Sequence, residues 1–282
     1  MTSPTTPPGL PTQPPTAPHA EAPTARAPSS LGAANPLPSA TTAPSNLLAF
    51  AAMYRLMLRS TATRGRLIAV GSLTGLSLLS AVIARFSKPD DSFLAGIDFA
   101  GANLGTLLPV AVLVFGAGTL GDLIDDGSLV YLWLRPIPTH LHAAAAWAAT
   151  ATIVLPLVGV PVLFATSIIE PDPGLLAGTA LALFIGTLSY AALSVTAGVR
   201  FRRALPWGLI YVLLWEGFVA GAGSNANRLA IRSYLRSILS ELADHPLKLA
   251  QFNLASGVVT PLVVGALALV YASRRLARSD IA

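Results

Sequence analysis

Cysteine is absent from this chain, and charged residues are scarce. Without a thiol, the 282-residue chain forms no disulfide, zinc ribbon or iron–sulfur cluster and has no thiol nucleophile. Charged residues make up 11% of the sequence, against roughly 25% in soluble domains, while hydrophobic residues make up 53%. A chain with so little charge cannot cover its surface in water, so we expect lipid to solvate much of it.

The nucleotide-binding signatures are also missing. No GxxxxGK[ST] phosphate loop occurs anywhere in the sequence. Gly116, Gly118 and Gly121 match the GxGxxG spacing, but that fingerprint requires a preceding strand in a βαβ unit, and here the glycines end an apolar run. The net charge of +5 comes from basic residues that flank apolar stretches, so no nucleic-acid partner is expected. No cofactor is expected on this chain.

Two regions differ in composition. Residues 1–45 hold twelve of the 23 prolines and few bulky apolar residues. This pattern predicts a disordered Pro/Thr/Ala-rich tail, and it lacks the basic start and apolar core of a signal peptide. The remainder, 46–282, is predicted to be one helical membrane domain. It starts with an amphipathic helix over 47–64, of the kind that lies in the membrane interface.

Six apolar stretches are long enough to cross a bilayer, which takes about 20 residues. They cover residues 67–84, 102–121, 143–168, 174–198, 204–223 and 253–273. Pairs of glycines four residues apart predict close contacts between these helices. The pairs are Gly71/Gly75, Gly101/Gly105, Gly174/Gly178 and Gly217/Gly221. The predicted fold is therefore an all-α membrane protein with six transmembrane helices.

The basic residues predict the orientation of the spans. One set of connecting segments holds eleven: Arg55, Arg59, Arg64, Arg66, Arg135, Arg200, Arg202, Arg203, Arg274, Arg275 and Arg278. The opposite set holds six: Arg85, Lys88, Arg228, Arg232, Arg236 and Lys248. Positive residues concentrate on the cytoplasmic side of membrane proteins. Both termini are therefore predicted to be cytoplasmic.

Two polar groups near the spans suggest alternative chemistries. Asp122, Asp125 and Asp126 lie in sequence near His140 and His142, so a metal site is conceivable, although a solvated loop is the preferred interpretation. Glu216 falls inside the fifth span, about 20 Å from Arg203 along a helix. A carboxylate at such depth needs a partner or a water-filled path.

Two amphipathic segments accompany the spans. Residues 118–138 run from a span into a polar turn and then a short helix that Pro136 and Pro138 end. The bulky apolar residues of that helix indicate either an interfacial anchor or a docking surface for a soluble partner. Residues 227–242 predict a second amphipathic helix that lies on, or dips into, the outer membrane surface, with Arg228, Arg232 and Arg236 in one stripe.

Three places in the sequence resemble the permease subunits of ABC type-2 exporters. Tyr54-Arg55-Leu56 through Arg66, including Arg59, resembles the family's elbow helix before the first span. Tyr211-Val212-Leu213-Leu214-Trp215-Glu216-Gly217, with Ile231 to Tyr234, resembles its fifth span and the following region. The most specific match, to the family's dGTlvYlwlRPvpR stretch, is Asp126-Gly127-Ser128-Leu129-Val130-Tyr131-Leu132-Trp133-Leu134-Arg135-Pro136-Ile137-Pro138.

The resemblance implies a half-transporter in the plasma membrane of a bacterium. Two such subunits, as a homodimer or heterodimer, would pair with soluble ATPase subunits that bind ATP and magnesium. This chain would supply the pathway, and the family analogy implies export. The coupling residues it implies are Asp126, Gly127, Leu129, Tyr131, Trp133, Arg135 and Pro136. The chain itself would not be an enzyme.

Two other functions are compatible with the residues. Glu216 as a titrating group would suit an ion- or proton-coupled secondary carrier. Asp122, Asp125 and Asp126 with a metal would suit an integral-membrane enzyme that modifies lipids. A soluble ATPase partner would distinguish the first function from both alternatives.

Overall fold

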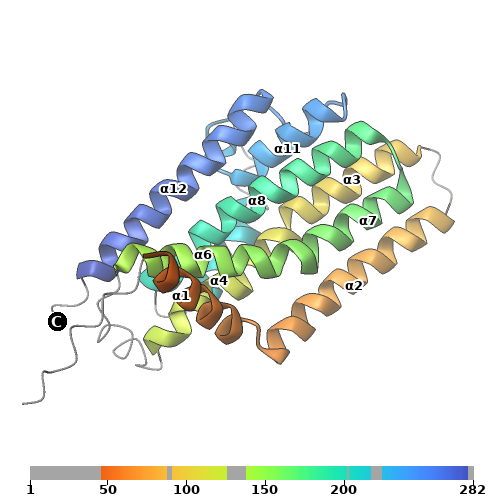
Figure 1. Cartoon of the computed structure of the whole chain (residues 1–282). Coiled ribbons are helices and arrows are strands. Elements are labelled where there is room, and N and C mark those ends of the chain that lie inside the picture. The colour runs from red at the N-terminus through yellow and green to blue at the C-terminus, as the bar shows by residue number, and fades with distance from the viewer. Residues whose placement is uncertain (1–45, 88–90, 126–137, 202, 217–223, 279–282) are drawn as a thin grey trace, which may run out of the picture. The chain divides into compact units, whose positions relative to one another are not determined.

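The computed structural model describes residues 46–87, 91–125, 138–201, 203–216 and 224–278, all within one unit, Pro44–Ala282. Every regular element in these ranges is helical (Figure 1). The elements are α1 (Asn46–Thr61), α2 (Arg64–Phe86), α3 (Ser92–Gly105), α4 (Leu107–Asp125), α6 (Thr139–Val154), π-helix η1 (Leu155–Gly159), α7 (Val160–Ile169), α8 (Pro173–Arg200), α9 (Ala204–Ile210), π-helix η2 (Tyr211–Glu216), α10 (Ser224–Asn227), α11 (Ile231–Leu242) and α12 (Leu254–Arg278). The predicted tail lies outside the described residues.

Aspartate side chains begin two of these helices. The Leu94 backbone N–H donates to Asp91 Oδ1 at 3.0 Å ahead of α3, and the Leu175 N–H donates to Asp172 Oδ1 at 2.7 Å ahead of α8. Each bond satisfies an N–H group that has no partner within the helix, which fixes where the helix begins. Pro173 follows as the first residue of α8, where its missing N–H costs nothing.

Five of the described helices are long and apolar enough to cross a membrane. Two of them combine consecutive elements: α3 and most of α4 form Ser92–Asp122 (31 residues), and α6, η1 and α7 form Thr139–Ile169 (31 residues). The other three are α2, Arg64–Phe86 (23 residues), α8, Pro173–Arg200 (28 residues), and α12, Leu254–Arg278 (25 residues). These are the properties of a membrane protein. They correspond to five of the six predicted spans, and the second helix starts ten residues before the predicted 102, at Ser92.

The predicted span over 204–223 differs from the other five. Its described part consists of α9, with seven residues, and η2, with six. That length is short of the roughly 20 residues that a bilayer requires, and residues 217–223 lie outside the described ranges. The structure therefore supports five membrane-crossing helices and a shorter apolar one.

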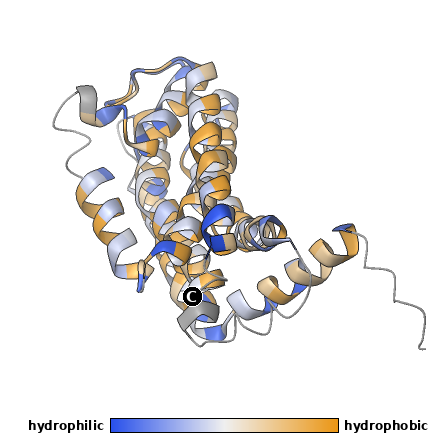
Figure 2. Cartoon of the chain, turned by 90° about the vertical axis from the view of Figure 1, so that its left-hand side faces the viewer, coloured by the Kyte–Doolittle hydropathy of each residue, from blue (hydrophilic) through white to orange (hydrophobic). Residues whose placement is uncertain are grey.

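The helices differ in how far the protein covers them. α8 packs against α4, α6, α11 and α12, and most of its residues are buried. By contrast, α2 turns large apolar side chains outward, namely Ile68, Leu73, Leu76, Leu79 and Ile83. Figure 2 shows such hydrophobic residues along the outer faces of the helices. An apolar exterior over a packed apolar interior is what lipid solvation requires.

The arginines of the larger basic set gather at one end of the helices. The starts of α2 and α6 and the ends of α8 and α12 lie at the same end, next to α1 (Figure 1). Among the described members of the set, Arg55 and Arg59 are in α1, Arg64 and Arg66 begin α2, Arg200 ends α8, Arg203 precedes α9, and Arg274, Arg275 and Arg278 end α12. We call this the arginine-rich end. The elements α10 and α11 lie toward the opposite end.

The GxGxxG glycines serve helix packing. A Cβ at Gly116 would collide with the Ser194 side chain, and one at Gly118 would collide with the Arg66 guanidinium. Gly121 faces the backbone of Gly198, whose own added Cβ would lie 2.5 Å from the Ala117 carbonyl oxygen. These contacts let α4 approach α8 and α2 closely, which small residues permit in membrane helices.

The second amphipathic helix is shorter and more buried than its pattern predicts. α11 begins at Ile231, because the chain leaves helical geometry after Asn227. Its apolar face, including Leu235 and Ile238, is fully buried against α8, α12 and α3. The pattern predicts a helix that lies on, or dips into, the outer membrane surface, but the apolar face is covered by the bundle itself. An amphipathic pattern shows that one face of a helix is apolar, but it does not show whether lipid or neighbouring helices cover that face.

Candidate functional site

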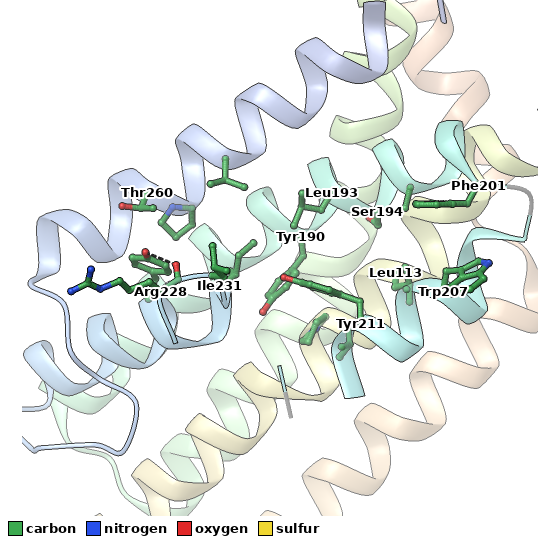
Figure 3. Close-up of a pocket in the computed structure, with 18 residues that line it drawn as sticks. Leu113, Tyr190, Leu193, Ser194, Phe201, Trp207, Tyr211, Arg228, Ile231 and Thr260 are labelled. Carbon is green, nitrogen blue, oxygen red and sulfur yellow. Dashed lines mark hydrogen bonds between the residues drawn. The ribbon is translucent and has the colours of Figure 1, made fainter. Parts of the chain in front are cut away.

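A groove of about 540 Å³ runs between α4, α8, the α9–η2 segment, the start of α11 and α12 (Figure 3). Phe201 and Trp207 lie at one end, Tyr190 and Tyr211 near the middle, and Arg228 at the other end. The volume lies within the roughly 300–1,000 Å³ of small-molecule sites. The groove is lined by Pro109, Leu113, Tyr190, Leu193, Ser194, Ala197, Phe201, Trp207, Gly208, Tyr211, Val212, Arg228, Leu229, Ile231, Tyr234, Thr260, Pro261 and Val264.

Three polar groups of the groove wall already have protein partners. The Ser194 hydroxyl donates to the Ala191 carbonyl at 3.1 Å, and the Tyr234 hydroxyl donates to the Arg228 carbonyl at 2.9 Å. The Tyr190 hydroxyl donates to Glu216 Oε2. Because these donors are already used, the middle of the groove presents an apolar and aromatic surface to a ligand.

Glu216 is the fully buried carboxylate behind this wall. It ends η2, and its carboxylate interacts with the Tyr190 and Tyr211 hydroxyls and with the Ile231 backbone N–H. Among the described residues, Oε1 has no well-formed hydrogen bond. Arg232 Nη1 lies 3.5 Å from the Glu216 backbone carbonyl oxygen, so a cation stands beside the site. The predicted need for a partner is thus met mainly by tyrosine.

Sequence reasoning did not identify Tyr190 and Tyr211 as members of this site. Tyr190 comes from α8, 26 residues before Glu216, and nothing in the sequence links the two. Tyr211 lies five residues before Glu216, which is the spacing that a π-helix brings onto one face. An α-helix would have offset them. The π-helical turn is therefore the local feature that assembles the site.

The three arginines predicted as one stripe separate in the structure. Arg228 precedes α11 and is exposed at the end of the groove, whereas Arg232 and Arg236 lie over the glycines of α3. An added Cβ at Gly105 would collide with the Arg232 side chain, and one at Gly101 would lie 3.6 Å from Arg236 Nη2. The glycine pair in α3 therefore makes room for guanidinium groups.

Both covered arginines are only partly satisfied. Arg236 Nη1 donates to the Lys248 carbonyl at 3.3 Å, and within the described ranges the Nε atoms of Arg232 and Arg236 have no partner. Burial and then the neighbouring Arg232 charge lower the pKa of Arg236 below its ordinary value, while Asp98 acts in the opposite direction. A guanidinium stays charged under these conditions, so this pair is a fixed positive charge.

At the arginine-rich end, hydroxyl groups connect three helices. The Thr61 hydroxyl of α1 donates to Thr119 Oγ1 of α4 at 3.1 Å, and Thr119 Oγ1 lies 3.3 Å from Thr150 Oγ1 of α6. All three threonines are buried. Nearby, Arg66 Nη2 of α2 lies 2.6 Å from Asp122 Oδ2 of α4. The last turn of α1 is thereby tied to the helices on either side of residues 126–138.

The predicted elbow residues lie in a helix. In α1, Met53 and Met57 are buried in a cluster that includes Ala146, while Arg55 and Arg59 are exposed and Tyr54 is half-buried. The predicted coupling residues, from Asp126 to Pro136, lie outside the described residues. Only the two flanking helix ends are described: α4 ends at Asp125 and α6 begins at Thr139. Both ends lie at the arginine-rich end (Figure 1).

The acidic and histidine residues weighed as a metal site are not brought together in the described part of the chain. Asp122 pairs with Arg66, and the His142 Nδ1 atom lies 3.2 Å from the Pro138 carbonyl oxygen in a buried position. No group of three metal-ligating side chains occurs among the described residues, a set that omits the side chains of Asp125 and Asp126.

No protein-family model matches the chain, and no curated protein is similar to it at a significant level. The assignment of a function therefore depends on the residues and their arrangement.

Proposed function

We propose that this chain is the membrane-spanning subunit of an ATP-driven transporter of the ABC type-2 exporter kind. In this proposal α1 is the elbow helix, the α9–η2 segment belongs to a sixth span, and a separate soluble ATPase supplies the energy. Two copies of the chain, or this chain and a related one, would enclose the pathway in a bacterial plasma membrane. The termini would be cytoplasmic, since the arginine-rich end would face the cytoplasm.

The observation that carries the proposal is the link between α1 and the helices that flank residues 126–138. An ATPase on the cytoplasmic side can move the spans only through elements that reach it. The sequence resembling the family's coupling stretch connects α4 to α6, whose flanking ends are at the arginine-rich end. The buried Thr61, Thr119 and Thr150 hydroxyls join α1 to both helices. A push on this connection would therefore reach α1, α4 and α6 together.

The groove supports a transport role as well. It extends from Phe201, next to the arginine-rich end of α8, to Arg228, which follows α10 toward the opposite end. Because its wall is formed by α4, α8, the α9–η2 segment, α11 and α12, relative movement of these helices would change its width. A pathway for cargo needs such a movable wall.

Co-purification tests the proposal. The full chain, tagged at its C-terminus and solubilised from its native membranes, should bring down a soluble ATPase with a GxxxxGK[ST] loop. The complex should hydrolyse ATP, and a mixture of two differently tagged copies should show whether the permease pairs with itself. A chain recovered without any ATPase, at several detergent strengths, would contradict the proposal.

A second candidate, a proton-coupled carrier, is favoured by the burial of Glu216 among Tyr190 and Tyr211. The two candidates predict different behaviour for Glu216→Gln, which keeps the size of the side chain and an acceptor for Tyr190. A carrier that binds its proton at Glu216 loses transport in this variant. An ATP-driven permease in which Glu216 is a helix contact keeps ATP-dependent transport.

A further inference from the structure

We propose that the groove binds an anionic amphiphile, a molecule with one long apolar chain and a negatively charged headgroup, with the headgroup at Arg228. This inference depends on the proposed transporter function for its physiological meaning, since it names the class of cargo. The binding itself is a property of this chain alone and is tested without an ATPase.

The middle of the groove selects for an apolar chain. Leu113, Leu193, Val212 and Pro261 are among its walls, and the hydroxyl groups of Tyr190 and Tyr234 donate to other protein atoms. A polar cargo would therefore leave its own donors and acceptors without partners along this part, which is unfavourable. Glu216 stands behind the tyrosines and does not line the groove, so its charge does not attract a cation into it.

The charge at the groove's end selects for an anion. Of the described lining residues, Arg228 alone carries a formal charge, and it has no ion-pair partner in the described part of the chain. Figure 3 shows it at the end of the groove opposite Phe201 and Trp207. Arg232 and Arg236 face the glycines of α3 and do not line the groove, so Arg228 is the charge that a ligand in the groove meets. An apolar channel that ends at an unpaired guanidinium is complementary to a chain with a carboxylate or phosphate head.

A titration with matched probes tests this assignment. The purified full chain in a neutral maltoside detergent is titrated with cis-parinaric acid, an 18-carbon fatty acid that fluoresces in apolar sites, and with its uncharged methyl ester. The acid should bind more tightly than the ester in the wild type. Arg228→Gln should weaken binding of the acid about fivefold at low salt, with the difference shrinking at high salt, and leave the ester unchanged. Arg85→Gln, an exposed arginine of α2, is the matched control and should change neither.

A filling variant identifies the groove as the site. Val264→Trp adds bulk at a lining position of α12 that is 39% exposed, so it should block both probes without repacking the core. Val270→Trp on the same helix is 46% exposed and does not line the groove, so it should bind both probes normally. Monodisperse elution and unchanged thermal stability show that each variant is folded.

The same titration in lipid nanodiscs identifies the source of the amphiphile. If phosphatidylglycerol nanodiscs suppress binding of the acid and phosphatidylcholine nanodiscs do not, the natural occupant is an anionic membrane lipid. If the acid binds in both, the occupant is a free amphiphile.

Equal binding of acid and ester by the wild type, or unaltered binding in Val264→Trp, overturns the proposal. Either result leaves the recovery of an ATPase unaffected, so this inference and the proposed function fail separately.

Discussion

The hydrogen bond from Tyr190 to Glu216 provides the sharpest test of the site's architecture. Tyr190→Phe removes one hydroxyl and keeps the ring that lines the groove. Both residues are buried in the wild type, with Glu216 at 0% exposure, so water cannot replace the lost donor. The carboxylate keeps its weaker interactions with the Ile231 N–H, the Tyr211 hydroxyl and the Arg232 charge.

The expected loss of stability in Tyr190→Phe follows from two known ranges of hydrogen-bond free energy. Hydrogen bonds to charged groups contribute roughly 1.5–3 kcal/mol in proteins. Hydrogen bonds between membrane helices average about 0.6 kcal/mol and reach about 1.7. Because this bond is fully buried and involves a carboxylate, we expect the value at which the ranges overlap, about 1.5 kcal/mol. That loss lowers the folding equilibrium constant roughly tenfold.

A double-mutant cycle measures the bond itself. The free energy of unfolding is determined in mixed micelles with increasing sodium dodecyl sulfate, followed by tryptophan fluorescence. Tyr190→Phe should destabilise the wild type by about 1.5 kcal/mol and should have almost no effect in a Glu216→Ala background. Tyr271→Phe, on a 46% exposed tyrosine of α12, should change the stability by less than about 0.5 kcal/mol. Equal losses in the two backgrounds would show that the hydroxyl does not act through Glu216.

Three other predictions concern helix packing, the orientation of the chain and the Pro-rich tail. Gly198→Ala should destabilise the protein by about 1–3 kcal/mol in the same unfolding assay, because the new Cβ meets the Ala117 carbonyl oxygen. The control Gly71→Ala in α2 should be neutral or slightly stabilising, because nothing lies within 4 Å of its added Cβ. A reporter active only in the cytoplasm should give signal when fused after Ala282 and none at Asp172; the reverse pattern would contradict the orientation. Deleting residues 1–45 should leave membrane insertion and complex assembly intact, and a loss of assembly would assign the tail a binding role.

The membrane character and most of the helices could be predicted from the sequence because both depend on composition and on runs of apolar residues. The predicted second span, 102–121, began ten residues too late. Asp98 interrupts the apolar run in the sequence, although it stays exposed at the helix surface within Ser92–Asp122. Asp172 falls in the gap between the predicted spans 143–168 and 174–198, and its side chain caps the start of α8 by accepting from the Leu175 N–H. Local chemistry of this kind is visible in a sequence.

The candidate site was predictable only in part. The cost of a carboxylate in a membrane segment singled out Glu216 and demanded a partner for it. The partner's identity depends on tertiary packing of α8 against η2, and a 26-residue separation carries no local signal. The prediction that Arg228, Arg232 and Arg236 form one stripe was wrong for a different reason. Helical periodicity assumes an unbroken helix, and the chain leaves helical geometry between Asn227 and Ile231.

The most direct test of the account is the interaction of residues 126–138 with an ATPase. The double variant Leu129→Asp/Trp133→Asp puts two charges where the proposal requires a desolvated contact, at a cost on the order of several kcal/mol. Gln251→Asp/Ala255→Asp adds the same charges at two exposed positions toward the opposite end and is the matched control. At equal membrane levels, pull-down should recover the ATPase with the wild type and the control but not with the Leu129/Trp133 variant. Equal recovery with all three would contradict the coupling role and, with it, the proposed mechanism.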